Sequence, residues 1–307
     1  MAREKRVKDP YSLWSRIWRG RQNYMLLFPF LVFFFIFTLL PVLLSIVLGF
    51  TNYDMISSPT FVGFSNYMRM FFDDDVFLIA VKNTMIFALF TGPISYFLCF
   101  LFAWLINEMR PKLRAVCTTV FYAPALSGQA FTVWLFIFSS DQYGIINGAL
   151  MRMGFLNEPI AWLSDPAYNM TVLILVQLWM SLGTGFLAFI AGLQSIDTSL
   201  YEAAAIDGIR NRFQELWHVT LPSMVPQLVC GAVMQIISSF SVAEVSMRLA
   251  GFPSVEYSAE TVVTHIIDYG TLRFEMGYAS AMAVVLFILM VGTNQIVRRL
   301  LGKFAST

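Results

Sequence analysis

Polar and charged side chains stand out in residues 199–222, SLYEAAAIDGIRNRFQELWHVTLP, because long apolar segments flank them on both sides. Ser199 and Glu202 have the spacing of a capping box, in which the two side chains accept hydrogen bonds from free N–H groups at a helix start. Gly208 suits the left-handed position that follows the end of a helix. We therefore predict a short helix that ends at Gly208. The other charged residues near this glycine are Asp207, Arg210 and Arg212.

Asn211 and Gln214 repeat the capping spacing and predict the start of a second helix. Apolar side chains then recur at helical spacing as far as Leu221. Pro222 is predicted to start the next helix, because its missing N–H costs little in a first turn. The pattern of residues 199–222 is thus helix, glycine turn, helix.

A second set of polar residues lies within the apolar segments. Polar side chains at membrane depth are candidates for function, although many only join helices by hydrogen bonds. Gln177 and Gln235 are the strongest candidates for a substrate path, because a buried amide without partners is costly. The other candidates for this path are Trp179, Ser181, Thr184 and Ser239.

Several kinds of chemistry have no support in this sequence. The three cysteines and two histidines lack the spacing of metal ligands, and no nucleophile–base constellation is visible. No glycine-rich phosphate loop is present, so ATP chemistry would have to sit on another chain. We expect no catalytic residue, no metal and no cofactor on this chain, and no nucleic acid among its partners.

Composition places the chain in a membrane. Of its 307 residues, 58% are hydrophobic and 13% are charged, and the mean hydropathy is +0.68. A soluble domain of this length could not bury so much apolar surface. We predict an all-α polytopic protein with a cytoplasmic segment at residues 1–24 and a transmembrane domain at residues 25–307. Its six predicted spans are Met25–Phe50, Leu78–Ile106, Ala115–Phe138, Met170–Leu193, Ser223–Val245 and Met276–Val297.

The basic residues predict the orientation of these spans. Fifteen of the twenty Lys and Arg residues fall at the two ends or in the second and fourth connections, and such residues favour the cytoplasmic side. Both termini and residues 199–222 are therefore predicted to be cytoplasmic. Asp73, Asp74 and Asp75 fall on the outer side, where we expect a solvated loop; a calcium or receptor contact is the alternative.

Residues 199–222 resemble the cytoplasmic "EAA" loop of binding-protein-dependent ABC importer permeases. Glu202-Ala203-Ala204, Gly208 and Leu221-Pro222 carry this resemblance. Tyr122-Ala123-Pro124 and Gly277-Tyr278-Ala279-Ser280-Ala281 are similar to segments of sugar-importer permeases such as those for maltose and glycerol phosphate.

The resemblance implies a six-helix permease fold and alternating access. It implies that the loop docks into a partner ATPase through Glu202, Ala203, Ala204, Asp207 and Gly208. The implied partners are a second permease subunit, a cytoplasmic ATPase dimer that holds ATP and Mg, an extracellular solute-binding protein and membrane lipid. The implied location is the bacterial cytoplasmic membrane, and the implied cargo is a sugar or oligosaccharide.

One departure from the family pattern affects the second loop helix. Ten residues separate Gly208 from Val219, where the short form of the motif has nine, so we expect this helix to be rotated or lengthened. An ABC permease for a non-sugar solute and a membrane-embedded enzyme remain alternatives. The absence of Lys and Arg at membrane depth disfavours an anionic cargo.

Overall fold

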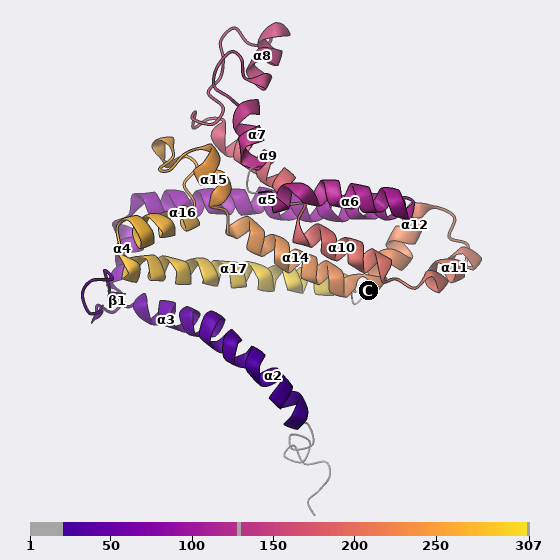
Figure 1. The fold of residues 1–307 in the computed structure, drawn as a ribbon, viewed down its shortest axis with the longest axis horizontal. Helices are drawn as coiled ribbons and strands as arrows, with labels where there is room; N and C mark the ends of the chain where they lie inside the picture. The colour runs from indigo at the N-terminus through magenta and orange to yellow at the C-terminus, as the bar shows by residue number, and fades with distance from the viewer. Residues whose placement is uncertain (1–20, 128–129, 306–307) are drawn as a thin grey trace, which may run out of the picture.

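The computed structural model describes the backbone of residues 21–127 and 130–305 as an elongated bundle of helices (Figure 1). The side chains of Thr184 and of residues 300–305 lie outside the description. A short two-stranded hairpin pairs Thr51 with Phe61 and Asn52 with Thr60 at one end of the bundle. The predicted loop at residues 199–222 lies at the opposite end, on the right of Figure 1. The predicted segment 1–24 falls mostly outside the described residues.

The helices and strands follow one another along the chain with few long connections. The α-helices are α2 Arg21–Phe34, α3 Leu40–Leu48, α4 Ser65–Phe72, α5 Asp75–Asn107, α6 Pro111–Leu126, α7 Ala130–Ile137, α8 Ile145–Arg152, α9 Asn169–Met180, α10 Thr184–Gln194, α11 Thr198–Ile206, α12 Arg212–Glu215, α13 Leu221–Ser223, α14 Val225–Phe240, α15 Glu244–Leu249, α16 Val262–Ile267 and α17 Met276–Ala305. The strands are β1 Thr51–Asn52 and β2 Thr60–Phe61, the π-helical turns are Phe35–Leu39, Leu216–Thr220 and Asp268–Leu272, and a 3₁₀ turn is Val255–Tyr257.

Four of these stretches are long and apolar enough to cross a membrane. Within the described residues they are Arg21–Leu48, Asp75–Asn107, Asn169–Gln194 and Met276–Arg299. They match the first, second, fourth and sixth predicted spans. Two further helix pairs pass the same test together, which gives up to six spans if each bent pair counts as one.

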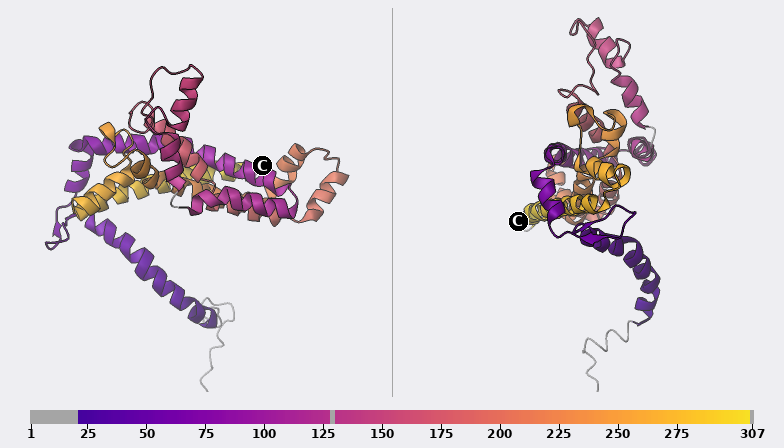
Figure 2. Two further views of the ribbon diagram at one scale, coloured as in Figure 1. Left: turned by 45° about the horizontal axis from the view of Figure 1, so that its top comes forward. Right: turned by 90° about the vertical axis from the view of Figure 1, so that its left-hand side faces the viewer.

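The third and fifth predicted spans are sharply bent rather than straight. The axes of α6 and α7 differ by 82° across residues 127–129, so α7 points out of the bundle towards α8 (Figure 2). Pro124 lies in the last turn of α6, where its ring weakens the helix. A second bend, of 81°, falls at Met224 between residues 212–223 and α14.

The bend at Met224 corrects one expectation from the sequence. Pro222 does not start the helix that crosses the bundle, because it lies in α13 as the continuation of the second loop helix. The crossing helix α14 begins at Val225 and has Pro226 in its first turn. Pro226 occupies a first-turn position, where a missing N–H is harmless, whereas Pro222 directly follows the π-helical turn Leu216–Thr220.

The core of the bundle is formed by α5, α10 and α14, which pack against one another along their lengths. Phe186 and Phe189 of α10 are fully buried, and they pack in a cluster with Cys99 of α5 and Met224. Gly231 of α14 permits this approach, because a Cβ there would lie 2.4 Å from Phe189. α17 then packs on α14 and on α3.

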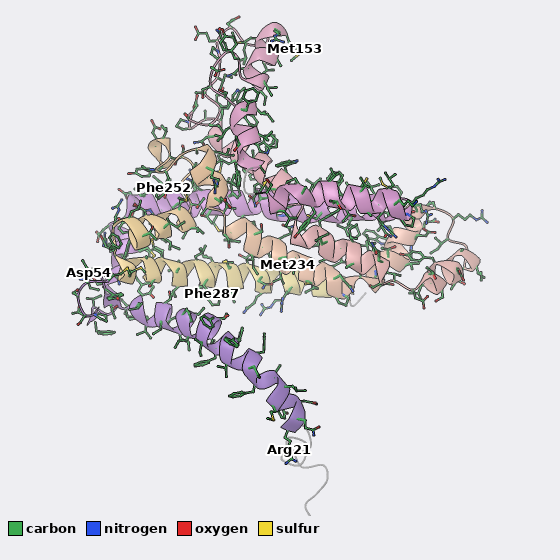
Figure 3. All side chains as sticks on the ribbon, in the orientation of Figure 1. Arg21, Asp54, Met153, Met234, Phe252 and Phe287 are labelled. Atoms are coloured by element: carbon green, nitrogen blue, oxygen red, sulfur yellow. The ribbon has the colours of Figure 1, made fainter. Side chains whose placement is uncertain are left out.

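Helix α2 extends away from the rest of the bundle (Figures 1 and 2). None of its residues is buried, and its apolar side chains point outward all round, as the sticks near Arg21 show in Figure 3. Such a helix suits an apolar surrounding such as lipid or a neighbouring subunit.

Candidate coupling loop and substrate path

The first helix of the loop, α11, is capped differently from the prediction. Its N-cap is Asp197, whose Oδ1 accepts from the backbone N–H of Ser199 at 3.0 Å. Ser199 is therefore inside the helix, and the predicted Ser199–Glu202 capping box is wrong. Since Asp197 performs the capping, the Glu202 carboxylate makes no hydrogen bond or ion pair with the rest of the described chain, and its side chain is exposed.

The end of α11 is the one that the sequence predicted. Gly208 has φ of +95°, in the left-handed region that favours glycine. The N–H of Ile209 donates to the carbonyl of Ala204 at 3.0 Å, and the N–H of Gly208 donates to Ala205 at 3.3 Å. These two bonds form a Schellman motif, which stops the helix and turns the chain towards α12.

The second loop helix begins at the predicted residue. Asn211 is its N-cap, with Oδ1 accepting from the N–H of Gln214 at 2.8 Å. The Gln214 side chain accepts in return from the N–H of Arg210 at 3.0 Å, one residue before the cap. The two side chains thus satisfy two free N–H groups, one just before α12 and one in its first turn.

The second loop helix then contains a π-helical turn, Leu216–Thr220, which we call the π-turn. The N–H of Leu221 donates to the carbonyl of Leu216, five residues earlier. A π-helical turn holds one residue more than an α-helical turn. The additional residue between Gly208 and Val219 is therefore absorbed locally, and the helix continues on both sides of it.

Three contacts join the loop to itself and to the bundle. The hydroxyl of Tyr201 in α11 lies 3.0 Å from that of Thr220 in the π-turn. Arg212 pairs with Glu108, at the end of α5, at 3.2 Å. The ring of Phe213 packs on Trp104 of α5 with centroids 5.7 Å apart. These contacts link α11 to the π-turn and α12 to α5.

The outer surface of the loop is exposed in the described part of the chain. Glu202, Ala203, Asp207 and Gly208 are exposed, whereas Ala204 is buried against the chain itself. Large apolar side chains are exposed beside them, among which Ile206 is 87% and Trp217 is 70% accessible. Small residues, an unpaired carboxylate and exposed apolar groups together form a surface suited to a docked protein.

Three of the predicted path residues line two cavities that share Gln235 of α14. The polar cavity, of about 240 Å³, has Ser181 and Gln235 in its wall. The apolar cavity, of about 370 Å³, lies between α5, α14 and α17, and Ser239 lines it together with Gln235. Gln235 thus separates the two cavities and is 5% exposed.

The remaining predicted path residues lie nearby or outside the description. Gln177 is buried, and its Nε2 lies 3.5 Å from the hydroxyl of Ser238 in the wall of the polar cavity. Trp179 packs edge-on against Trp134, with ring centroids 5.4 Å apart, and does not line either cavity. The side chain of Thr184 lies outside the described residues.

The structure adds wall residues that the sequence reading missed. Tyr122, Ser238, Gly183 and Gly185 complete the polar cavity with apolar neighbours. Gly183 and Gly185 carried a usable signal, since paired glycines inside an apolar run indicate a break in a helix. Ser238 carried none, because serine is common on membrane helices.

The three-aspartate cluster at the other end of the bundle is only partly solvated. Asp73 and Asp75 are exposed, but Asp74 is 8% exposed and so corrects the expectation of a solvated loop. Its carboxylate accepts from the hydroxyl of Tyr278 at 2.7 Å and lies 3.0 Å from Nε2 of His265. Burial alone would raise the pKa of Asp74, but hydrogen bonds from these two residues and a backbone N–H lower it to about 2.

The apolar helices and the loop at one end define a multi-pass helical membrane protein. Comparison with known proteins then gives the family. A probable ABC transporter permease, YesP of Bacillus subtilis, is 33% identical over 87% of this chain and 86% of its own length. The arabinooligosaccharides transport system permease AraP of the same bacterium is 29% identical over 92% and 88%.

A solved structure shares the fold. The crystal structure of a bacterial alginate ABC transporter, in complex with an alginate pentasaccharide-bound periplasmic protein, has a chain that matches with a TM-score of 0.75 and 23% identity. The match covers 96% of this chain and 99% of the other. A scan against protein-family models finds no match. The chain belongs to the ABC transporter permeases.

Proposed function

We propose that the chain is the membrane-spanning subunit of an ATP-driven importer that passes a sugar or oligosaccharide into the cytoplasm. The docking surface of the loop carries this proposal. Its Glu202 carboxylate has no partner in the described part of the chain, and the Schellman turn at Gly208 presents the end of α11 to an incoming protein. This surface would seat in an ATPase subunit, with Glu202 paired to a basic side chain.

The membrane topology that fits this role has six spans, with each bent helix pair counted as one. Both termini and the loop lie in the cytoplasm, on the side where fifteen of the twenty Lys and Arg residues gather. The membrane is the bacterial cytoplasmic membrane. A second permease subunit completes the pore, and its presence would cover exposed apolar side chains such as those of α2.

ATP and Mg are bound by the ATPase dimer and not by this chain. Closure of the dimer on ATP draws the docked loops together, and the contacts of Arg212 and Phe213 with the end of α5 pass this movement to the bundle. The bundle then alternates between outward- and inward-facing states around the polar cavity. The external solute-binding protein delivers the cargo to the outward-facing state.

The sugar class of the cargo is supported by the names of the relatives, among which AraP is an arabinooligosaccharide permease. Ser181, Gln177 and Gln235 are the residues of this chain that we assign to the path. Their hydroxyl and amide groups donate and accept hydrogen bonds, as recognition of sugar hydroxyls requires.

Copurification and transport test the function together. The chain, tagged and expressed with its chromosomal neighbours, is expected to copurify with an ATPase and a second permease. In proteoliposomes this complex should import an oligosaccharide only with internal ATP and the external binding protein. Uptake by the chain alone, driven by an ion gradient and without either partner, would overturn the proposal.

A further inference from the structure

The proposed transport path runs along the polar cavity and leaves the apolar cavity, of about 370 Å³, without a role. The apolar cavity lies where α14 packs against both α5 and α17. Met85 and Leu89 of α5 line it and are 44% and 69% exposed, so the cavity is open at the surface of the bundle. Both residues lie well inside the span Asp75–Asn107, so the opening faces the surroundings of the membrane helices.

The polar side chains in the wall of the apolar cavity are already hydrogen-bonded within the chain. The hydroxyl groups of Tyr96, Thr293 and Ser239 each donate to a backbone carbonyl, at 3.2, 2.9 and 2.8 Å. The Nε2 of Gln235 donates to the sulfur of Cys99. The other residues of the wall are apolar. Such a wall suits a hydrocarbon chain better than a sugar, whose hydroxyl groups need partners.

The side chain of Lys82 lies on the same face of α5 as the wall of the cavity. Lys82, Leu89 and Tyr96 follow one another at seven-residue intervals, each about 20° short of two full helical turns. Lys82 is exposed, and within the described part of the chain its ammonium group has no hydrogen-bond or ion-pair partner. A cation without a partner therefore lies about one turn from Met85, at one end of the cavity.

The position of Lys82 along α5 matches the boundary of a bilayer. α5 has 33 residues and is about 50 Å long, whereas the hydrocarbon core of a bilayer is about 30 Å thick. With the core centred on α5, about 10 Å of the helix projects at each end. Lys82 lies seven residues after Asp75, about 10 Å along the helix, so its long side chain reaches the layer of lipid phosphates.

We propose that the apolar cavity binds an acyl chain of a phospholipid whose phosphate pairs with Lys82. The acyl chain lies along Leu89 and Tyr96 and fills the space between α5, α14 and α17. The orientation proposed above makes this a lipid of the outer leaflet. An apolar helix of a second subunit would also fill the cavity, but it would leave the ammonium group without an anion at the edge of the membrane.

Native mass spectrometry of the assembled complex, purified in detergent and titrated with lipid, tests the pairing with Lys82. The probes are phosphatidylglycerol and a diacylglycerol with the same acyl chains, which lacks the phosphate. We expect Lys82→Gln to weaken the binding of one phosphatidylglycerol about tenfold and to leave diacylglycerol unaffected. Arg152→Gln, which removes an exposed charge on α8, is the control. Equal affinity of the wild type and Lys82→Gln for phosphatidylglycerol overturns the proposal.

A matched pair of variants on α17 tests the cavity itself. Thr293→Phe places a ring in the cavity, whereas Ile296→Phe places the same ring at a position that is 61% exposed and outside the wall. We expect the complex with Thr293→Phe to retain one phosphatidylglycerol fewer than the complex with Ile296→Phe. Equal numbers of retained lipids overturn the proposal. If Thr293→Phe does not assemble, the titration of Lys82→Gln decides.

A photo-crosslinker identifies the occupant of the cavity. The amino acid p-benzoylphenylalanine, in place of Leu89 at the open edge, is activated in the assembled complex in phosphatidylglycerol nanodiscs. We expect the mass of this chain to increase by that of one phospholipid. A crosslink to the second permease instead would show that a protein helix fills the cavity and would overturn the proposal. These experiments measure bound lipid and not uptake, so the importer function and the lipid site fail separately.

Discussion

The hydroxyl of Tyr201 in α11 donates to the hydroxyl of Thr220 in the π-turn over 3.0 Å. The direction follows from the geometry, because the Thr220 hydroxyl itself donates to the carbonyl of Glu215 at 3.3 Å. Thr220 is 2% exposed and lies four residues before the bend at Met224. The helix that would dock the ATPase is thus hydrogen-bonded to the π-turn, which lies just before the bend into α14.

Replacement of Tyr201 by Phe removes this bond and keeps the ring. One such hydrogen bond contributes about 0.5–1.5 kcal/mol. Its loss is too small to unfold the bundle but is enough to weaken the connection between α11 and the π-turn. We expect assembly to be retained and the number of ATP molecules hydrolysed per sugar imported to rise. Tyr143→Phe is the control, since that exposed side chain makes no hydrogen bond in the described structure. An unchanged number of ATP molecules hydrolysed per sugar imported in Tyr201→Phe would show that the hydrogen bond between Tyr201 and Thr220 has no role in coupling.

Reversal of the charge at Glu202 tests docking. The carboxylate is exposed and unpaired in the described chain, so Glu202→Lys should leave the thermal unfolding of the isolated permease within about 0.5 kcal/mol of the wild type. We expect it to abolish copurification of the ATPase and substrate-stimulated hydrolysis. Glu158→Lys, an exposed charge far along the chain, is the matched control. Normal transport by Glu202→Lys would rule out the docking role.

Deletion of one residue tests the π-turn. Since a π-turn is an α-helix with one additional residue, removal of the exposed His218 should restore regular α-helix and leave the flanking faces in place. We expect ATP-driven uptake within about twofold of the wild type, a change below 0.5 kcal/mol. Deletion of Ala203 is the control. Because α11 contains no π-turn that could absorb the loss of a residue, this deletion should abolish uptake. Loss of uptake in both deletions would show that the π-turn itself is needed for transport.

The helix boundaries within the loop could be predicted from the sequence, but the contacts between the loop helices and with the bundle could not. Gly208 and Asn211 act on N–H and carbonyl groups within a few residues, so their roles follow from spacing alone. The cap at Asp197 was missed because Ser199 and Glu202 offered an equally regular pattern two residues later. The bonds from Tyr201 to Thr220 and from Arg212 to Glu108 depend on tertiary packing, which no local pattern records.

Hydropathy locates spans well but says little about their shape. The windows that predicted Ala115–Phe138 and Ser223–Val245 average over bends, so the 82° and 81° kinks left no trace in them. The break at residues 181–183 was similarly hidden, although Gly183 and Gly185 marked it. Asp74 was misjudged because its partners, His265 and Tyr278, are about 200 residues away in sequence.

Gln235 is predicted to matter for uptake, and Ser239 provides its control on the same helix. Gln235→Leu removes an amide from the polar cavity and leaves the sulfur of Cys99 without its donor. We expect the KM for uptake to rise about tenfold, the cost of losing hydrogen bonds in a buried site. The Ser239 hydroxyl donates to the carbonyl of Gln235 in its own helix at 2.8 Å and faces the apolar cavity. Ser239→Ala should therefore transport normally, and equal effects of both changes would contradict the assigned path.

Glu260, in the connection before α16, should make stability depend on pH. It is 3% exposed, and burial raises its pKa above the ordinary 4.5, although Thr264 donates to its Oε1 at 2.8 Å. A carboxyl group with a raised pKa in the folded state contributes most below its unfolded pKa, and that contribution is lost as pH rises through the folded pKa. Glu260→Gln keeps the acceptor and removes the charge, so we expect a higher midpoint of thermal unfolding at neutral pH and little change below pH 4.5. Glu158→Gln, at an exposed position, should shift neither midpoint. If Glu260→Gln raised the midpoint of thermal unfolding equally at neutral pH and below pH 4.5, ionisation of Glu260 would not be the cause of the increase.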